Sequence, residues 1–559
     1  MRSLPRPRRT LTASAVTLSL SATLLLASTA RAEGPAANVD QYVLWRESHD
    51  RSGDAKPEQL TLINYMFFRA TATNMLGDPS GLKGVSLGPI GQIGGSFTRV
   101  GDNANGYYVE QRWIPVLQYS PSFVDGLASF RAQMEVDFTW GLAANQVQPN
   151  QGGGLNADEV NIQTKNVNVS IYPTRDPEEL SIVLGTQAMY DSIYDPATTS
   201  LFDIVRTGYK LAFFGTDATG MAVYSKLFGL AKIGLFPFGS AQPDKASKND
   251  PRFSFAGMFT ADAAYPIWPG TIVGASYWHL QDDTKGAAYA YEGLVKSGPA
   301  STGLGSFTGV PQFNLQEPTG HVEYVGLNFH HNLAFNTSRL AASGFAMFNW
   351  GRFTSTKEGA PLKKVDIRGV SANLEVDYKY GRTNGDQITL EGMFTSGDDN
   401  PNDKLYTSAF TINNYGLPGA VWFNHKTLLL FPFTSTVNNY TGQVTDISNQ
   451  GYGLLAGIAT ASRDLIPNKL NAKIGTAVGE SAVNPLPNAD GTTRGRFLGW
   501  EINAELKYTI RYLMTVGLHG GYLFKGSPAG GFKGSFHNGN PQVTADPWAA
   551  FTTFTWYAF

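Results

Sequence analysis

Apolar and polar residues alternate without a break over residues 129–140 (SFRAQMEVDFTW). Successive side chains of a β-strand point to opposite faces of a sheet, so this stretch predicts a strand with one apolar face and one ionic face. A soluble sandwich would bury the apolar face in its core, whereas an outer-membrane barrel would turn it toward lipid. The apolar set is Phe130, Ala132, Met134, Val136, Phe138 and Trp140, and the polar set is Ser129, Arg131, Gln133, Glu135, Asp137 and Thr139.

Two further stretches, 370–380 and 501–510, repeat this pattern. A length of about ten residues, an aromatic residue near one end and a charged second face are typical of a tilted membrane-spanning strand. One face would meet lipid and the other would line a wet lumen. The inward sets are Ser371, Asn373, Glu375, Asp377 and Lys379 in the first stretch, and Glu501, Asn503, Glu505, Lys507 and Thr509 in the second.

Weaker forms of the pattern predict strands along most of the chain, about eighteen in all, which is typical of an all-β, transmembrane, antiparallel up-and-down barrel. The first strand is either 60–73 or 86–100, and counts of sixteen or twenty stay open because 421–431 is also strand-like. The other strands are predicted at 107–119, 127–140, 158–172, 180–190, 205–214, 219–228, 252–263, 271–281, 322–333, 339–351, 365–380, 387–396, 449–462, 469–478, 497–510, 512–524 and 547–559.

Short and long connections alternate between these strands if 397–448 is one loop. Such parity is expected of barrels with short periplasmic turns and long external loops. The tight connections include 215–218 and 381–386, and the long ones include 229–251, 282–321 and 397–448. The two longest connections are long enough to fold inward and narrow the lumen.

The beginning of the sequence predicts export. Four arginines, an apolar run and an Ala-Arg-Ala site form a secretory signal peptide over residues 1–32, with a membrane anchor helix as the weaker alternative. Residues 33–59 are expected to be a periplasmic lead-in, and 60–559 the barrel. The chain has no Cys, which excludes disulfides, thiolate metal sites and a lipoprotein anchor.

Composition favours the same compartment. The 559 residues include 61 Gly and 12% aromatic residues, and Lys+Arg 43 nearly balances Asp+Glu 45. A nucleic-acid binder would show a basic stripe, so that class is excluded as a partner. These features favour a multi-pass barrel in the outer membrane of a Gram-negative cell, with outer-membrane lipid as a partner.

The chain ends in WAAFTTFTWYAF, with Phe551 and Tyr557 on one face and Phe559 as the last residue. A terminal aromatic strand that pairs with the first strand would close the cylinder and remove both sheet edges. This ending resembles the signal read by the barrel-assembly machinery, which is therefore an expected partner.

Three short motifs resemble the alginate-export family of outer-membrane porins. LSIVLGTQ (180–187) is similar to a strand ending in Gly-Arg-Gln, with Thr186 in place of Arg; FDIVR (202–206) is similar to Phe-Asp-Gly-Val-Arg; and TSGDDNPND (395–403) is similar to a Ser-Gly-Asp loop. The resemblance implies an eighteen-strand porin that exports an exopolysaccharide such as alginate.

The predicted pore-lining charges point away from a polyanion. A lumen that passes a polyanion should hold a surplus of Arg and Lys, whereas the three clearest strands are acidic on balance. Arg206 and Lys210 add a local basic contribution from another strand. We therefore expect a channel for hydrophilic solutes, with a saccharide as one candidate. The predicted pore-lining residues are Arg131, Gln133, Glu135, Asp137, Arg206, Asn373, Glu375, Asp377, Lys379, Glu501, Glu505 and Lys507.

Other chemistry is weakly indicated. Asp398, Asp399 and Asp403 offer hard oxygen ligands that Ca²⁺ would accept, but the EF-hand spacing is absent, which favours a solvated acidic turn. The histidines are scattered, and no nucleophile can be joined to a base. The sequence therefore predicts no enzyme and no cofactor; a barrel-embedded enzyme and a surface adhesin or structural barrel are the alternatives.

Overall fold

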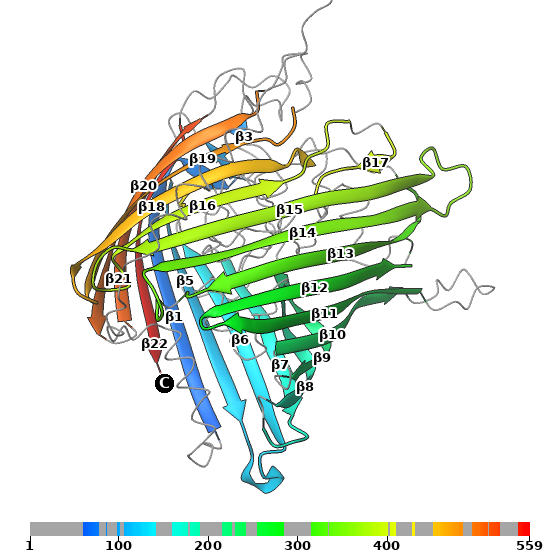
Figure 1. Ribbon diagram of the computed structural model, residues 1–559, viewed down its shortest axis with the longest axis horizontal. Coiled ribbons are helices and arrows are strands. Elements are labelled where there is room, and N and C mark those ends of the chain that lie inside the picture. The colour runs from blue at the N-terminus through cyan, green and yellow to red at the C-terminus, as the bar shows by residue number, and fades with distance from the viewer. Residues whose placement is uncertain are drawn as a thin grey trace, which may run out of the picture.

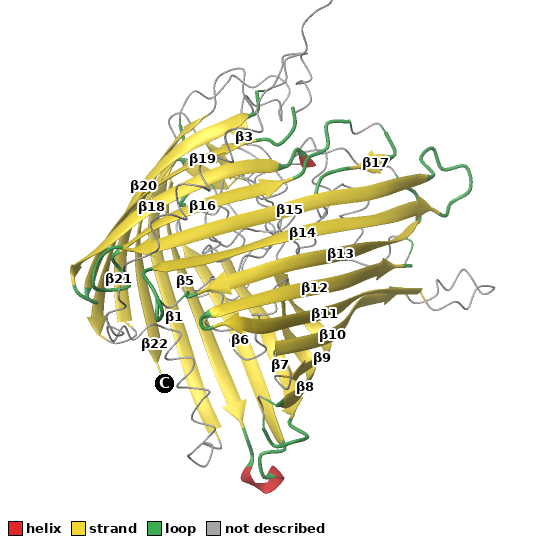
Figure 2. Ribbon diagram, in the orientation of Figure 1, coloured by secondary structure: helices red, strands yellow, loops and turns green. Residues whose placement is uncertain are grey.

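The computed structural model is built of β-strands, with one short 3-10 helix in the part of the chain it describes (Figure 2). It describes residues 60–77, 85–86, 98–100, 106–140, 159–176, 179–190, 215–225, 230–241, 254–283, 285, 315–333, 335–400, 403–409, 427–430, 451–484, 495–511, 514–525 and 546–558. The long strands are β1 (Leu60–Thr73), β5 (Gly106–Tyr119), β6 (Ala128–Trp140), β7 (Glu159–Ile171), β8 (Leu180–Tyr190), β9 (Gly215–Ser225), β10 (Leu230–Ala241), β11 (Ser254–Trp268), β12 (Thr271–Asp282), β13 (Pro318–His331), β14 (Leu340–Ser355), β15 (Lys364–Lys379), β16 (Gln387–Thr395), β18 (Leu454–Ile466), β19 (Leu470–Glu480), β20 (Phe497–Arg511), β21 (Met514–Lys525) and β22 (Trp548–Ala558). The short elements are β2 (Met75–Gly77), β3 (Val85–Ser86), β4 (Thr98–Val100), η1 (Ser122–Val124) and β17 (Leu405–Tyr406).

The long strands follow one another in chain order, each antiparallel to the next (Figure 1). β1 pairs with β5 on one side and with β22 on the other, so the sheet closes on itself and leaves no long edge. The sheet contains 19 strands, of which β17 has only two residues and lies parallel to β15. The other eighteen form the wall. The predicted antiparallel barrel, its strand count and its closure by the last strand are therefore confirmed.

The first strand of the wall is 60–73, not the rival 86–100. β1 pairs along its whole length with β5. β3 and β4 instead join β2 in a separate sheet of three short strands, within the connection between β1 and β5.

One region of the prediction is wrong. The expected tight connection at 215–218 is the start of β9, and β10 lies within 229–251, which was predicted to be a long loop. Gly234, Pro237 and Gly239 gave β10 the composition of a loop, yet Pro237 stands at a register shift in the pairing with β11, where a proline is tolerated. The predicted strand at 205–214 lies outside the described residues.

The parity of the connections is retained after this correction. The connections that follow β5, β7, β9, β11 and β13 at one end of the barrel are two to eight residues long. The connections at the opposite end include 283–317 and 396–453. Residues 427–430 of the strand-like run 421–431 form bends and not a strand. The rest of that run lies outside the described residues, as do 1–59 with the predicted signal peptide and lead-in.

The two faces of the wall differ in exposure as the alternation predicts. On β15, Val370 and Leu374 are 39% and 44% exposed, whereas the intervening Asn373 is 5% exposed. On β20, Ile502 is 41% exposed and Glu501 is fully buried. These two strands therefore present large apolar side chains outward and polar side chains inward. Within the described residues, no helix is long and apolar enough to cross a membrane.

Candidate functional site: the inner wall of the barrel

A row of charged side chains crosses the inner wall on β19, β20 and β21. Lys473 forms an ion pair with Glu505, and the other oxygen of Glu505 lies 2.7 Å from Nδ1 of His519. Nε2 of His519 lies 3.0 Å from Oγ1 of Thr553 on β22. These side chains share one level because Lys473 and His519 both stand directly opposite Glu505 on the two neighbouring strands.

The row continues across the closing strand onto β1 and β5. The ring of Phe551 on β22 stacks on His519 with a centroid distance of 4.6 Å, and the guanidinium of Arg69 lies 5.5 Å from the same ring. Nε of Arg69 donates to Glu110 on β5 at 2.6 Å, and both side chains are buried. We call Lys473, Glu505, His519, Phe551, Arg69 and Glu110 the seam belt, because they join both sides of the closure.

Beyond β5 the inner wall carries amides. Asn166 on β7 donates to Gln133 on β6 at 3.2 Å, and both are fully buried. Asn168 donates to the carbonyl of Thr186 at 2.9 Å, which ties β7 to β8. This sector of the wall therefore offers amide hydrogen-bonding groups, beside the charged side chain of Arg131, which contacts Gln133.

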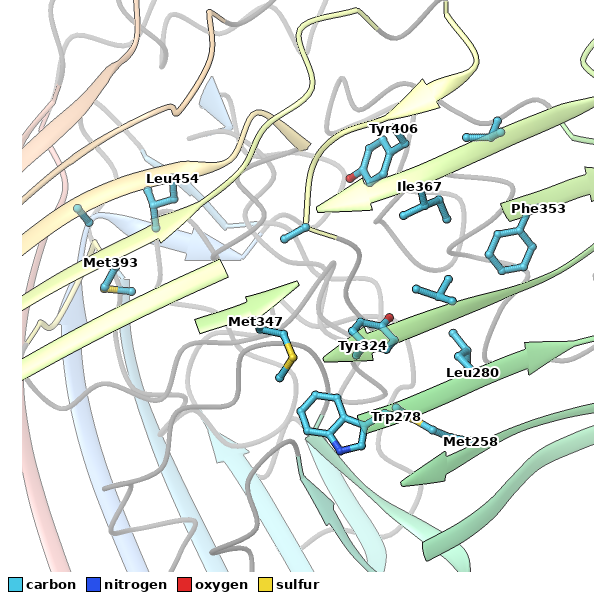
Figure 3. Packing of buried hydrophobic residues seen from close by; sticks show 14 of the residues in the cluster. Met258, Trp278, Leu280, Tyr324, Met347, Phe353, Ile367, Met393, Tyr406 and Leu454 are labelled. Carbon is cyan, nitrogen blue, oxygen red and sulfur yellow. The ribbon is translucent and has the colours of Figure 1, made fainter. Parts of the chain in front are cut away.

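The sector from β10 to β16 combines a buried apolar cluster with buried polar side chains. Figure 3 shows Trp278 and Tyr324, whose ring centroids are 6.0 Å apart, among the buried side chains of this sector. Tyr406, Leu429 and Leu430 belong to the same buried cluster although they come from the long connection between β16 and β18. The described parts of that connection therefore pack on the inner wall of the barrel, as the length of 397–448 suggested.

Glu501 on β20 fixes this connection to the wall. Its Oε1 accepts from the backbone N–H of Leu428 at 2.7 Å and from the side-chain amide of Asn503 at 2.8 Å. Its Oε2 accepts from the backbone N–H of Leu429 at 3.1 Å and of Leu430 at 2.6 Å. Glu501 is 0% exposed, so three backbone donors of one short segment converge on a fully buried carboxylate. We call 427–430 the pinned segment.

The structure places the predicted pore-lining residues on the inner face but not at one level of exposure. Gln133, Asn373, Asp377 and Glu501 are buried, Arg131, Glu375, Lys379 and Glu505 are half-buried, and Lys507 is exposed. On β20 the exposure rises from Glu501 through Glu505 to Lys507, toward the short-turn end of the barrel. The inner wall is thus covered beside the pinned segment and accessible at the turn end. Arg206 and the side chains of Glu135 and Asp137 lie outside the described residues.

Sequence reasoning missed four members of the seam belt: Arg69, Glu110, Lys473 and His519. β1 shows no clean alternation in LTLINYMFFRATAT, because both of its faces carry large apolar or aromatic residues. Arg69 among these residues and His519 on β21 form no motif in the sequence. Only the strand register places both of them against the ring of Phe551.

Two carboxylates of the predicted calcium site have other partners in the described part of the loop. Within the described residues, no group of three His, Asp or Glu side chains could hold a metal ion. Asp398 accepts from the backbone N–H groups of Asn400 and Thr407, and Asp403 accepts from that of Leu405, so these oxygens hold the turn. Burial raises the pKa of the Asp398 carboxyl, although the hydrogen bonds from Asn400 and Thr407 oppose the rise. The solvated-turn alternative describes Asp399 and Asp403 better than a metal site does.

No protein-family model and no curated protein matches the chain. Among solved structures, OccK5 (OpdH) of Pseudomonas aeruginosa is 11% identical with a TM-score of 0.42, over 89% of this chain and 97% of that one. OccK9 (OpdG) of the same species is 11% identical with a TM-score of 0.45, over 89% and 98%, and OccAB4 of Acinetobacter baumannii is 11% identical with a TM-score of 0.41, over 90% and 100%. At these values the likeness assigns neither a family nor a function. The resemblance to the alginate-export family stays a prediction.

Proposed function

We propose that the protein is an outer-membrane channel that passes small hydrophilic solutes. The observation that carries this proposal is the closed wall, whose outer face exposes large apolar side chains while its inner face holds charged and amide groups. A closed antiparallel sheet pairs its backbone N–H and C=O groups internally, so its strands can cross a hydrocarbon layer at low cost. Soluble barrels turn a mainly polar outer face toward water, which is the opposite of the outer face found here.

The compartment follows from this function. The barrel lies in the outer membrane of a Gram-negative cell, exported by the predicted signal peptide and surrounded by outer-membrane lipid. The short turns face the periplasm, the long connections face outside, and β22 presents the aromatic end of the chain to the assembly machinery. These orientations rest on the parity of the connections, since barrels of this class carry their longer loops outside.

The solute class follows from the seam belt and the amide sector. Cations and carboxylates of the belt are paired with one another, so the wall offers alternating donors and acceptors and not a field of one sign. An aromatic ring, Phe551, lies between His519 and Arg69. Paired charges, amides and one ring suit a hydrated, uncharged polar solute such as a saccharide better than a polyanion. The pinned segment limits the size of that solute.

Reconstitution into a planar bilayer tests this function. We expect stepwise conductance with a weak cation preference in a salt gradient, because carboxylates outnumber cations among all the inward residues that the sequence predicts on the three clearest strands. An added neutral oligosaccharide should reduce the current in a concentration-dependent way. Strong anion selectivity would favour the polyanion exporter instead, and no conductance even with 397–448 shortened would contradict a channel.

A further inference from the structure

A charged patch lies on the outer face of the barrel, on the ends of β12 to β15 nearest the long connections. The patch contains His279, His321, Arg352, Lys364 and Arg368, together with two carboxylates, Glu323 and Asp366. Pairing places these side chains next to one another: His321 stands opposite Arg352, Arg352 opposite Asp366, and His279 opposite Glu323. We call this set the rim patch. Its position is unusual, since the outer face of the same strands is apolar below it.

The two carboxylates of the rim patch are already occupied. Glu323 accepts from the hydroxyl of Tyr277 at 2.7 Å and lies 2.7 Å from Nδ1 of His279. Asp366 accepts from Arg352 and, at 3.2 Å, from Nζ of Lys364. Each carboxylate thus has two donors, and neither is left to attract a cation from solution.

The cations of the patch keep donors that point outward. The side chains of Arg352 and Lys364 are 52% and 42% exposed, although both contact Asp366. Arg368 is exposed and forms no ion pair with any described residue. His321 is also exposed, and its ring stacks on that of His279 with centroids 6.2 Å apart. Three permanent cations therefore stand against two satisfied carboxylates, which leaves a surplus of positive donors.

Aromatic side chains mark the depth of the patch. Trp350 stands opposite Arg368 and Tyr277 opposite Val325, and the rings of Phe348 and Trp350 stack 5.4 Å apart. Aromatic girdles of membrane barrels lie at the boundary between hydrocarbon and headgroups. Arg352 and Lys364 lie on the loop side of Trp350, and Arg368 lies level with it, so the patch stands at the boundary between hydrocarbon and headgroups.

We propose that the rim patch binds the phosphate groups of an anionic lipid in the leaflet next to the long connections. Arginine binds phosphate through parallel charge-assisted hydrogen bonds, and Arg352 and Arg368 are diagonal neighbours, roughly 7–8 Å apart in a sheet of this kind. That spacing suits a headgroup with two phosphates. This inference rests on the proposed function, because it requires the outer face to stand in a membrane.

The test measures the melting temperature of the purified full chain in detergent against lipid A, which carries two phosphates. We expect a saturable rise with lipid A, a smaller one with its monophosphoryl form, and none with phosphatidylcholine or inorganic phosphate. Replacing both arginines (R352A/R368A) should weaken the apparent affinity about 30-fold, since each basic residue at a membrane surface contributes about a factor of five. Arg368→Gln alone breaks no ion pair among the described residues and should weaken it about fivefold.

Two arginines outside the rim patch, one half-buried and one exposed, serve as controls. Arg496 is at the same rim but forms an ion pair with Glu480, and Arg175 is in a short turn at the opposite end, where it pairs with Asp125. Arg496→Ala and Arg175→Ala should bind lipid A as the unmodified protein does. Equal losses in these variants, or equal stabilisation by inorganic phosphate, would overturn the proposal.

Conductance separates this proposal from the channel itself. Because the patch faces outward, R352A/R368A should conduct normally. Lipid binding by a protein that does not conduct would contradict only the proposed function, whereas conductance without any lipid A binding would contradict only the rim patch.

Discussion

Glu501 offers the sharpest perturbation of the inner wall, because one side chain connects β20 to the pinned segment. In Glu501→Gln, one side-chain oxygen remains as an acceptor. The second oxygen is replaced by an NH2 group, which cannot accept the hydrogen bonds of the backbone N–H groups. If the oxygen that bonds Leu429 and Leu430 is lost, two hydrogen bonds to a charged acceptor are removed. Each contributes about 1.5–3 kcal/mol. Neutralising a buried carboxylate offsets part of that loss, so we expect the segment to be held less tightly by roughly 2–4 kcal/mol.

The measurement has two parts. A released segment should leave the wall, so single-channel conductance should increase or begin to fluctuate between levels. Trypsin should also cleave more readily after Lys426, the residue that precedes the segment. Glu505→Gln is the control, since Glu505 lies on the same strand and face but pairs with the side chains of Lys473 and His519. It should alter ion selectivity without changing cleavage.

The reasoning about the pinned segment would be refuted by a specific result. If Glu501→Gln folds with an unchanged melting temperature, conductance and rate of cleavage, the three backbone hydrogen bonds do not hold the segment. If Glu505→Gln increases cleavage equally, the effect is a general loosening of the wall.

Three further predictions follow from the faces and the turns. Met134 is 42% exposed on the outer face, so Met134→Arg should lower the free energy of unfolding in a bilayer by about 2–4 kcal/mol. Lys507→Glu, at the exposed end of the inner face, should leave stability unchanged and increase cation preference. Equal loss of stability in both variants would mean that the faces are misassigned. Asp386 lies in the turn after β15. Burial raises the pKa of its carboxyl, but the hydrogen bonds from the backbone N–H groups of Asp464, Thr383 and Arg382 outweigh burial, so the pKa lies below its ordinary value of 3.8. Its contribution to stability should therefore be complete above pH 3.8 and lost as the pH falls through the lower, folded value, and Asp386→Asn should flatten that acid limb in thermal melts. A tag inserted at Gly305 should be cleaved by protease in whole cells, and cleavage only after lysis would reverse the orientation.

The strands that could be predicted are those whose two faces differ in chemistry. In 370–380 and 501–510 the period of two is visible in single residues, since Leu374 and Ile502 face outward while Asn373 and Glu501 face inward. β10 was missed because it breaks that period: its inner face holds Lys232 and Phe236, and glycine and proline occupy positions that read as loop.

The seam belt could not be predicted for a different reason. Arg69 and Glu110 are separated by 41 residues, and Phe551 reaches Arg69 only across the closure. Alternation predicts the face on which a side chain lies, but not which residues of other strands stand at the same level. That information is carried by the register, which depends on the length and shape of every intervening connection.

The run at 421–431 shows how the same apolar residues can satisfy two different structures. Leu428, Leu429 and Leu430 are strand-like by composition, and in a ladder their N–H groups would donate to a neighbouring strand. Inside the barrel Leu429 and Leu430 lie buried on the wall and Leu428 half-buried, and an unpaired buried N–H is costly. Glu501 supplies the acceptor that the ladder would have provided. From the sequence, a carboxylate on the inner face indicated a wet lumen. In the structure the carboxylate of Glu501 also accepts the N–H groups of a loop, so that loop can bury its backbone against the inner wall. In a barrel of this kind an inward acid should be tested as an anchor for a loop before it is assigned to the path of a solute.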